Sequence, residues 1–266
     1  MTNISVTKPT SAVLDGDIIV YRAAYWADKE GIDYLQARLL NDIKDWTPEG
    51  CTNVCVAMSC SVSNNFRKAL WPLYKSNRAD QVKPTCLYEA YGILQELPGI
   101  CIYKEANLEA DDLIGLSTSA DTSIGVTIDK DLVSTPGWHW NPHKQEAPVY
   151  VPEDQANSFF LQQWLTGDST DNIWGLWKWG PVKAKAFLKD KTFEEAVQGI
   201  WNLYLEEDWT KRPEERLPPL NKEEYALAQA RSVRILRNGE FNRETKEVSL
   251  WKPPLTKVLE ANMETK

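Results

Sequence analysis

The stretch "SAVLDGDIIVYRAAY" (residues 11–25) changes its pattern at Asp15. Residues 11–14 are typical of a buried strand, and the residues after Asp15 continue as a helix. Because a strand followed directly by a helix is the first half of a βαβ unit, this stretch predicts an α/β fold built on a parallel sheet.

The same alternation of strands and helices continues through the first half of the chain. Further strands are predicted at "TNVCVAMSC" (52–60), "GICIYKEA" (99–106), "SIGVTIDKDL" (123–132), "GWHWNP" (137–142) and "PVYVP" (148–152), with helices at 33–46, 85–97 and 109–118. From about Pro152 onward the pattern is helical. We therefore predict a mainly parallel central sheet with flanking helices in residues 1–151 and a helical region in residues 152–266.

Composition limits the class of protein. No apolar run approaches the roughly 20 residues that cross a bilayer, and the polar start "MTNISVTKPT" lacks the features of a signal peptide, so we expect a cytoplasmic protein without membrane contact. The five cysteines are odd in number and form no CxxC pair, so we expect reduced thiols. The net charge of −8 argues by itself against nucleic acid as a partner. That argument fails if the acidic residues converge on bound cations.

Acidic residues follow three of the predicted strands. Asp15 ends the first strand, the cluster in "NLEADDLIG" (107–115) follows the third, and Asp129 and Asp131 end the fourth. The middle cluster consists of Glu109, Asp111 and Asp112. Carboxyl ends of parallel strands lie at one edge of a sheet, where so many like charges need a positive partner. Two divalent cations with oxygen ligands, Mg²⁺ or Mn²⁺, fit that need, whereas helix caps and a solvated turn are the alternative for each cluster alone.

The stretch "LTGDSTDNIWGLWKWGPVKAKAFL" (165–188) combines glycines with acids and lysines. Asp168 and Asp171 come first, and Gly175 and Gly180 bracket a tight turn before a helix that starts at Pro181. A glycine loop that leads into a helix presents N–H groups to phosphate, and the lysines Lys178, Lys183 and Lys185 favour the same ligand. An ordinary helix hairpin is the alternative interpretation. The tryptophans at 174, 177 and 179 could stack on a base.

A second basic stretch is "NNFRKALWPLYKSNRADQVK" (64–83). Arg67, Lys75 and Arg78 could clamp a phosphodiester, and the alternative is a solvated helical face.

Taken together these motifs resemble the 5′ nucleases: flap endonucleases, the amino-terminal nuclease domain of DNA polymerase I and phage 5′→3′ exonucleases. The resemblance rests on "VLDGDII" (13–19), "FRKALWPLYKSNR" (66–78), "NLEADDLIG", "TIDKDL" (127–132) and "LTGDSTDNIWGLWKWGPVKAKA" (165–186), which occur in the family's order. The closing "ARSVRILRNGEFNRETKEVSLWKP" (230–253) is similar to the tail of exonucleases from short-tailed lytic phages. The implied fold is a PIN/resolvase-like core with a helix–hairpin–helix element at about 165–190.

The resemblance also implies roles for single residues. It implies a first metal ion held by Asp15, Glu109 and Asp111. It implies a second ion, with Asp111 shared, held by Asp129, Asp131 and Asp168, and support through water from Asp112 and Asp171. Lys75 and Arg78 match the residues that act on the scissile phosphate, with Arg67 nearby. The segment from Gly175 to Lys185 matches the hairpin that binds the duplex backbone, with a K⁺ ion on its carbonyl groups.

The implied activity is that of a metal-dependent 5′→3′ exodeoxyribonuclease of a phage, acting in the host cytoplasm as a monomer. Its implied substrates are duplex DNA ends, flaps and RNA primers paired to DNA. This chain departs from the family at Cys60, where another aspartate is usual, and at Trp174 and Lys178, where proline and glycine are usual. Two alternatives therefore stay open: a DNA-end-binding protein with a weakened site, and a PIN-type ribonuclease.

Overall fold

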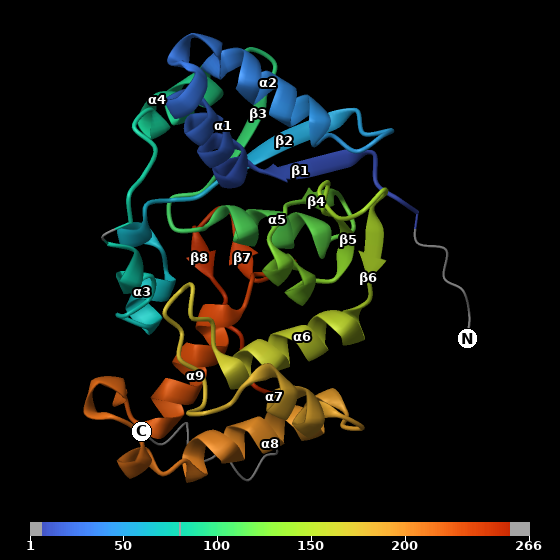
Figure 1. Cartoon of the computed structure of the whole chain (residues 1–266). Helices are drawn as coiled ribbons and strands as arrows, with labels where there is room; N and C mark the ends of the chain where they lie inside the picture. The colour runs from blue at the N-terminus through green and yellow to red at the C-terminus, as the bar shows by residue number, and fades with distance from the viewer. Residues whose placement is uncertain (1–6, 80, 256–266) are drawn as a thin grey trace. The chain divides into compact units, whose positions relative to one another are not determined.

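The computed structural model describes residues 7–79 and 81–255, which fall into two compact units (Figure 1). The first unit contains the described chain up to Phe66, residues 81–153 and Ile235–Ser249. The second contains Arg67–Ala79, Asp154–Arg234 and the described residues from Leu250 onward. Among the described residues, no helix combines the length and the apolar composition that a bilayer crossing requires.

A six-stranded sheet forms the centre of the first unit. Its strands are β1 (Ser11–Asp15), β2 (Asn53–Met58), β3 (Cys101–Lys104), β4 (Ile124–Val126), β5 (Gly137–Trp140) and β6 (Val149–Val151). The spatial order is β3-β2-β1-β4-β5-β6, and every neighbouring pair is parallel except β5 and β6. The predicted α/β class with a mainly parallel sheet is therefore confirmed. All six strands lie within the stretches that the sequence marked.

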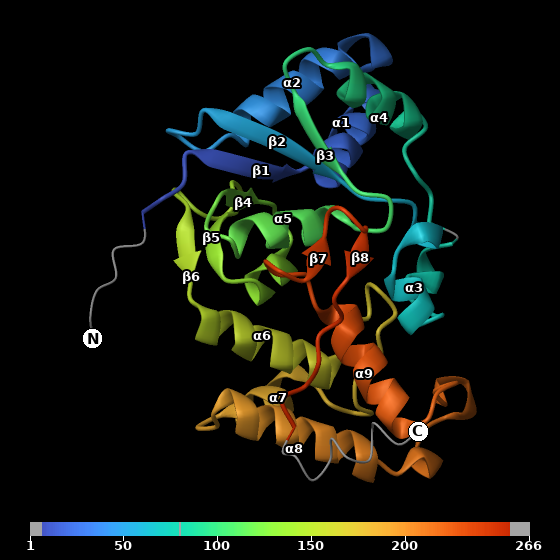
Figure 2. The same cartoon turned by 180° about the vertical axis from the view of Figure 1, so that it is seen from behind.

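Helices cover both faces of this sheet (Figures 1 and 2). On one face α1 (Gly16–Glu30), α2 (Leu35–Asp45) and α4 (Leu87–Glu96) pack over alternate strand residues such as Leu14 and Val56. On the other face α5 (Ala110–Thr118) packs over Val13 and Ala57. Two buried faces explain why the strands are continuous apolar runs rather than alternating ones.

A short hairpin near the chain end joins the α5 side of the sheet. It consists of β7 (Phe241–Asn242) and β8 (Glu247–Val248), which pair in an antiparallel manner. Phe241 and Val248 pack against the same hydrophobic cluster as α5, and Figure 2 shows the hairpin beside that helix.

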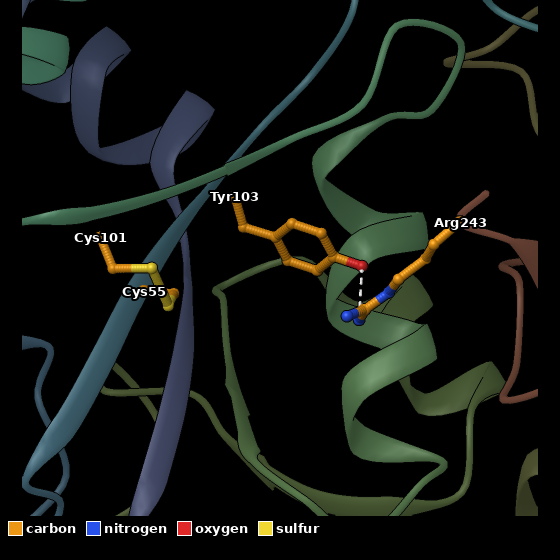
Figure 3. Close-up of a disulfide and its surroundings, with 4 residues drawn as sticks. All are labelled: Cys55, Cys101, Tyr103 and Arg243. Carbon is orange, nitrogen blue, oxygen red and sulfur yellow. Dashed lines mark hydrogen bonds between the residues drawn. A yellow bond between two sulfur atoms is a disulfide. The ribbon is translucent and has the colours of Figure 1, made fainter. Parts of the chain in front are cut away.

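A disulfide joins two neighbouring strands of the sheet (Figure 3). Cys55 of β2 and Cys101 of β3 face each other in the parallel register, with their Cα atoms 4.5 Å apart. The expectation that all five cysteines are reduced thiols is therefore wrong for these two. Cys51, Cys60 and Cys86 are not in a disulfide.

The second unit is built from helices. They are α3 (Arg67–Leu70), α6 (Glu153–Thr166), α7 (Pro181–Leu188), α8 (Phe193–Glu206) and α9 (Lys222–Val233). Its core is rich in large aromatic side chains, among them the fully buried Trp164, Trp201 and Tyr204. Short 3₁₀ helices occur in both units: Ile32–Tyr34, Val62–Asn64 and Lys130–Ser134 in the first, and Ser76–Arg78, Trp209–Lys211 and Glu214–Arg216 in the second.

The division of the chain differs from the expected split at residue 151. The boundary after Glu153 is close to that position, but two segments belong to the other unit. Arg67–Ala79 packs with the helical unit, and Ile235–Ser249 packs with the sheet. The sheet unit therefore depends on a segment that lies more than 80 residues beyond β6.

Candidate functional site

Asp15 stands at the carboxyl end of β1 and is almost fully buried, with 3% of its surface exposed. It is the N-cap of α1, and its Oδ1 accepts a hydrogen bond of 3.2 Å from the backbone N–H of Ile18. Its other oxygen accepts a 2.7 Å bond from the hydroxyl of Thr127. The strand-to-helix junction that the sequence predicted therefore fixes this carboxylate from two sides.

Thr127 connects Asp15 with the acids that follow β4. Its hydroxyl oxygen accepts a 3.0 Å bond from the backbone N–H of Asp129. Asp129 in turn caps the next 3₁₀ helix, because its Oδ1 accepts a 2.9 Å bond from the N–H of Asp131. Since β1 and β4 are parallel neighbours, both acid positions lie at one edge of the sheet.

Burial is the main cause that raises the pKa of Asp15 to about 7, because a charge in the interior loses its hydration. The charges of Asp17 and Asp129 raise it further, whereas the hydrogen bonds from Thr127 and Ile18 lower it. A carboxyl group with such a pKa is protonated in about half of the molecules at pH 7, and a bound cation would favour the ionised form.

Asp17 is a site residue that the sequence analysis missed. It lies in the first turn of α1, where its Oδ1 accepts bonds from the hydroxyl of Tyr91 (3.0 Å) and the N–H of Ser59 (3.4 Å). The available signal was the spacing "DGD", which places a second acid one residue after the glycine.

The acids of "NLEADDLIG" lie at the start of α5, which Glu109 caps. The end of β2 is tied to this point, since Ser59 Oγ accepts a 2.9 Å bond from the N–H of Ala110 and Cys60 donates its N–H to the carbonyl of Leu108 at 2.8 Å. Cys60, which stands where the family usually has an aspartate, therefore supports this acidic cluster through its backbone N–H. Asp111 is in the first turn of α5 and is partly exposed.

Asp112 stabilises the fold through hydrogen bonds to the backbone. It is fully buried, and its two oxygens accept bonds of 3.2 Å each from the N–H groups of Glu109 and Leu236. It therefore joins the start of α5 to the segment that returns from the far end of the chain. This position does not support the expectation that Asp112 assists a metal ion through water.

The donors at this edge fit a hard divalent cation in their chemistry. Every candidate ligand there is a carboxylate, and carboxylate oxygens are what Mg²⁺ and Mn²⁺ prefer. The carboxylates of Asp15 and Asp129 are turned towards hydrogen-bond donors of the protein. In residues 7–79 and 81–255, accordingly, no three Asp, Glu, His or Cys side chains form a ready-made metal cage. Cation binding at this edge requires the carboxylates to rotate towards a shared point.

The predicted phosphate-binding residues Lys75 and Arg78 lie in the second unit, where Asp171 connects them. The ammonium of Lys75 is 3.6 Å from Oδ2 of Asp171, and Arg78 donates to Oδ1. The hydroxyl of Tyr74 also donates to this carboxylate at 3.0 Å. Lys75 adopts the left-handed φ of 53°, which costs a non-glycine residue about 1 kcal/mol and is common at functional sites.

Arg67 has a different position from the one expected. It is buried, with 3% of its surface exposed, and its guanidinium donates to the carbonyls of Ser232 (2.9 Å) and Arg234 (2.7 Å). These carbonyls lie at the end of α9, where helix carbonyls lack partners within the helix. The structure therefore does not support Arg67 as a phosphate clamp, and it gives this residue a helix-capping role.

The loop of Asp168 and Asp171 is closed by two glycines. Gly167 and Gly175 both have positive φ, and a Cβ on Gly167 would lie 2.6 Å from the backbone nitrogen of Gly175. Asp168 pairs through its backbone with Ile173, and its Oδ1 accepts a 2.8 Å bond from the N–H of Thr170. The glycines are therefore required for this close approach.

The predicted hairpin is present, and α7 begins at Pro181 as expected. Lys183 lies 4.0 Å from the ring centre of Trp179, and Lys185 and Lys178 are exposed. The turn residue Lys178 has a left-handed φ of 59°, the conformation for which glycine would be the natural choice.

The carbonyl of Gly175, which was a candidate ligand for K⁺, already has two donors. The hydroxyl of Tyr225 donates to it at 2.5 Å and the guanidinium of Arg212 at 3.3 Å. Both lone pairs of this oxygen are therefore in use, so this atom does not support a K⁺ site.

Two curated proteins resemble the chain over nearly its whole length, although no family model matches it. The exonuclease of Escherichia phage T7 is 28% identical over 279 residues, which cover 91% of this chain and 93% of the phage protein. The exodeoxyribonuclease of Enterobacteria phage T3 is 26% identical, with 91% and 92% covered.

A solved structure has the same fold. A protein of bacteriophage T5 that was co-crystallised with metal ions superposes with a TM-score of 0.57 at 14% identity, covering 84% of this chain and 88% of the phage protein. A complex of the T5 flap endonuclease with DNA and metal ions gives a TM-score of 0.53.

Proposed function

The chain belongs to the 5′ nuclease superfamily, and from this premise we propose that it is a metal-dependent 5′→3′ exodeoxyribonuclease. Its proposed substrate is the 5′ end of duplex DNA, with flaps and RNA primers paired to DNA as further substrates. The names of the phage relatives support the reaction, since they are exonucleases over nearly the same length.

The observation that carries the proposal is that acidic residues follow the neighbouring parallel strands β1 and β4 at one edge of the sheet. The hydroxyl of Thr127 donates to the carboxylate of Asp15 and accepts the backbone N–H of Asp129, and the pKa of Asp15 is raised to about 7. Burying a carboxylate beside other carboxylates costs stability, because the charge loses hydration and is repelled by its neighbours. The arrangement is explained if a cation is the intended partner.

We assign the binding of divalent ions in the first unit to Asp15, Glu109, Asp111, Asp129 and Asp131. Asp17 is added because its charge acts on Asp15. Two ions, Mg²⁺ or Mn²⁺, suit the number of carboxylates, and such ions supply Lewis acidity towards water and phosphate oxygens when bound. Asp168 stays a prediction from the resemblance.

Lys75 and Arg78 are the proposed groups that stabilise the scissile phosphate. Asp171 holds the two cations, and the main-chain N–H of Lys75 also donates to the carbonyl of Asp171 at 2.9 Å. Cations fixed in this way lose less freedom when they meet a phosphate, so they contribute more to the transition state than mobile surface lysines.

The hairpin around Gly180 is proposed to bind the duplex backbone. Lys178, Lys183 and Lys185 provide its positive charge, and the N–H groups at the start of α7 provide donors. A K⁺ ion is not part of this proposal.

The test is digestion of a duplex that carries a label at its 5′ end. We expect release of the labelled nucleotide in Mg²⁺ or Mn²⁺ and none in excess chelator, with recovery when the cation is restored. Cleavage that persists in chelator, or that starts from the 3′ end, would contradict the proposal. Binding of the duplex without cleavage in any divalent cation would instead identify a DNA-end-binding protein, and preference for RNA of the same sequence a ribonuclease.

A further inference from the structure

A cavity of about 410 Å³ lies beside the hairpin, within the second unit. Three tryptophans and three cations supply most of its lining: Trp174, Trp177, Trp179, Lys178, Arg212 and Arg216. No described residue in the lining carries a carboxylate. A wall of aromatic faces and positive charges suits a ligand that is both flat and anionic.

Two side chains of the lining carry hydrogen-bond donors that lack a partner in the described part of the chain. The indole N–H of Trp177 and the Nε–H of Arg212 are buried and have no acceptor among the described residues. The remaining nitrogens of Arg212 are used, since they donate to Glu207 at 2.5 Å, to the carbonyl of Gly175 and to Tyr225 at 3.3 Å. An unpaired buried donor costs about 1–3 kcal/mol, so these two side chains gain if an acceptor oxygen of a ligand reaches them.

The indole of Trp174 is held in place for stacking. Its N–H donates to Oδ1 of Asn172 at 2.9 Å, and its ring meets Trp71 edge to face at 5.0 Å. The exposed guanidinium of Arg216 lies 5.0 Å from the centre of the same ring. The guanidinium of Arg216 therefore covers one face of this indole, and a base could displace it or stack beside it.

We propose that this pocket binds one unpaired nucleotide of a DNA strand, with its base on an indole face and its phosphate on the cations. An unpaired nucleotide is favoured over a base pair inside a duplex, because the faces of those paired bases are covered by their neighbours. The choice of DNA rests on the proposed function, whereas the nucleotide chemistry rests on the pocket itself. The pocket thus selects substrates that carry a single-stranded tail.

The test compares a blunt duplex with duplexes of the same sequence that carry a short 5′ or 3′ tail containing 2-aminopurine. Binding is measured by fluorescence anisotropy in chelator, so that no strand is cut, and stacking is measured as loss of 2-aminopurine fluorescence. We expect wild-type protein to bind one of the tailed duplexes about 5- to 10-fold more tightly than the blunt one, with quenching.

Three variants and one control locate the effect. Arg216→Ala and Trp177→Leu are expected to lose the tail preference and the quenching while keeping the affinity for blunt duplex. Trp177→Phe should retain part of the quenching, which separates stacking from a folding defect. Arg243→Ala is the matched control, since this arginine also lies over an aromatic ring, Tyr103 at 5.3 Å (Figure 3), but outside the pocket.

Equal affinity of wild-type protein for blunt and tailed duplexes would overturn the proposal. So would an equal loss for both duplexes in Arg216→Ala and Trp177→Leu. If the protein prefers tailed duplexes but cuts no DNA, the nucleotide pocket is supported and the nuclease proposal is wrong. If it cuts DNA without preferring tailed duplexes, the nuclease proposal is supported and the nucleotide pocket is wrong.

Discussion

The effect of the proposed metal site on the stability of the folded protein can be measured at Asp15. Its pKa is raised from 3.8 to about 7, so between these values the folded state binds a proton that the unfolded state has released. Stability therefore falls as pH rises from about 4 to 7, and the full penalty is present above pH 7. The asparagine variant has no such charge.

Asp15→Asn is accordingly expected to stabilise the metal-free protein above pH 7. The shift of pKa corresponds to about 2–4 kcal/mol at pH 8, with the gain vanishing towards pH 4. Thermal unfolding in chelator across this pH range measures it. Asp28→Asn is the control with the opposite sign, because the hydrogen bonds from Thr85 lower the pKa of Asp28. Destabilisation of Asp15→Asn at pH 8 would contradict the raised pKa.

Asp111→Asn tests the ligand assignment in the first turn of α5. We expect this variant to lose cleavage in Mg²⁺ and to bind duplex DNA as well as wild-type protein or better, because one negative charge is removed. Asp121→Asn is the control, since Asp121 is exposed and precedes the amino end of β4. Normal turnover of Asp111→Asn would rule out its role as a ligand.

Lys75→Ala tests the proposed stabilisation of the scissile phosphate. Single-turnover cleavage is expected to slow by about 100-fold, as for loss of a charged donor in other enzymes, with a much smaller change in DNA affinity. Lys68→Ala serves as the control, because Lys68 lies in the same segment and donates to the carbonyl of Pro72. Equal losses of rate and affinity in Lys75→Ala would reduce Lys75 to simple docking of phosphate.

The sequence predicted these residues with uneven success, for physical reasons. Lys75 and Arg78 share one carboxylate partner, while the neighbouring Arg67 is buried. All three occur in one basic stretch, and nothing local distinguishes them. The partners of Arg67 lie 165 and 167 residues away, so its burial depends on contacts that no local pattern contains.

At the level of elements, long apolar or amphipathic stretches were predictable. The helix α7 begins at Pro181 as expected, and α5 begins one residue after its predicted start, because a proline and a capping residue mark these starts. The hairpin of β7 and β8 was not predicted, since two residues per strand carry no period. The pairing of Cys55 with Cys101 arises from strand register across 46 residues.

The packing of α5 against the returning segment gives a prediction at this scale. A Cβ on Gly115 would lie 2.5 Å from the carbonyl oxygen of Leu236 and 2.6 Å from a methyl of Ile235. Gly115→Ala is therefore expected to destabilise the protein by about 1–3 kcal/mol in urea unfolding. Gly92→Ala in α4 is the control, because its Cβ would meet no atom within 4 Å and alanine favours a helix by about 0.5–1 kcal/mol. Equal effects of the two changes would contradict this packing.

At the scale of the whole molecule, the chain crosses between its two units. Arg67–Ala79 carries the basic residues Lys75 and Arg78 into the helical unit, and Ile235–Ser249 completes the sheet unit. The sequence predicted only a single boundary at residue 151, because a change of pattern along the chain separates neighbouring stretches and does not show which distant segments pack together. The net charge of −8 belongs to the same scale. Part of this negative charge comes from the carboxylates at the edge of the sheet, and we propose that bound cations relieve their mutual repulsion.

Calorimetric titration of Mn²⁺ into the metal-free protein at pH 7 tests this account most directly. We expect two ions per chain, with release of protons because the pKa of Asp15 is raised to about 7 in the metal-free state. Asp111→Asn should bind fewer ions, and Asp15→Asn should release fewer protons. Absence of binding at millimolar Mn²⁺, or the same stoichiometry and proton release in all three proteins, would contradict the claim that these carboxylates form a metal centre.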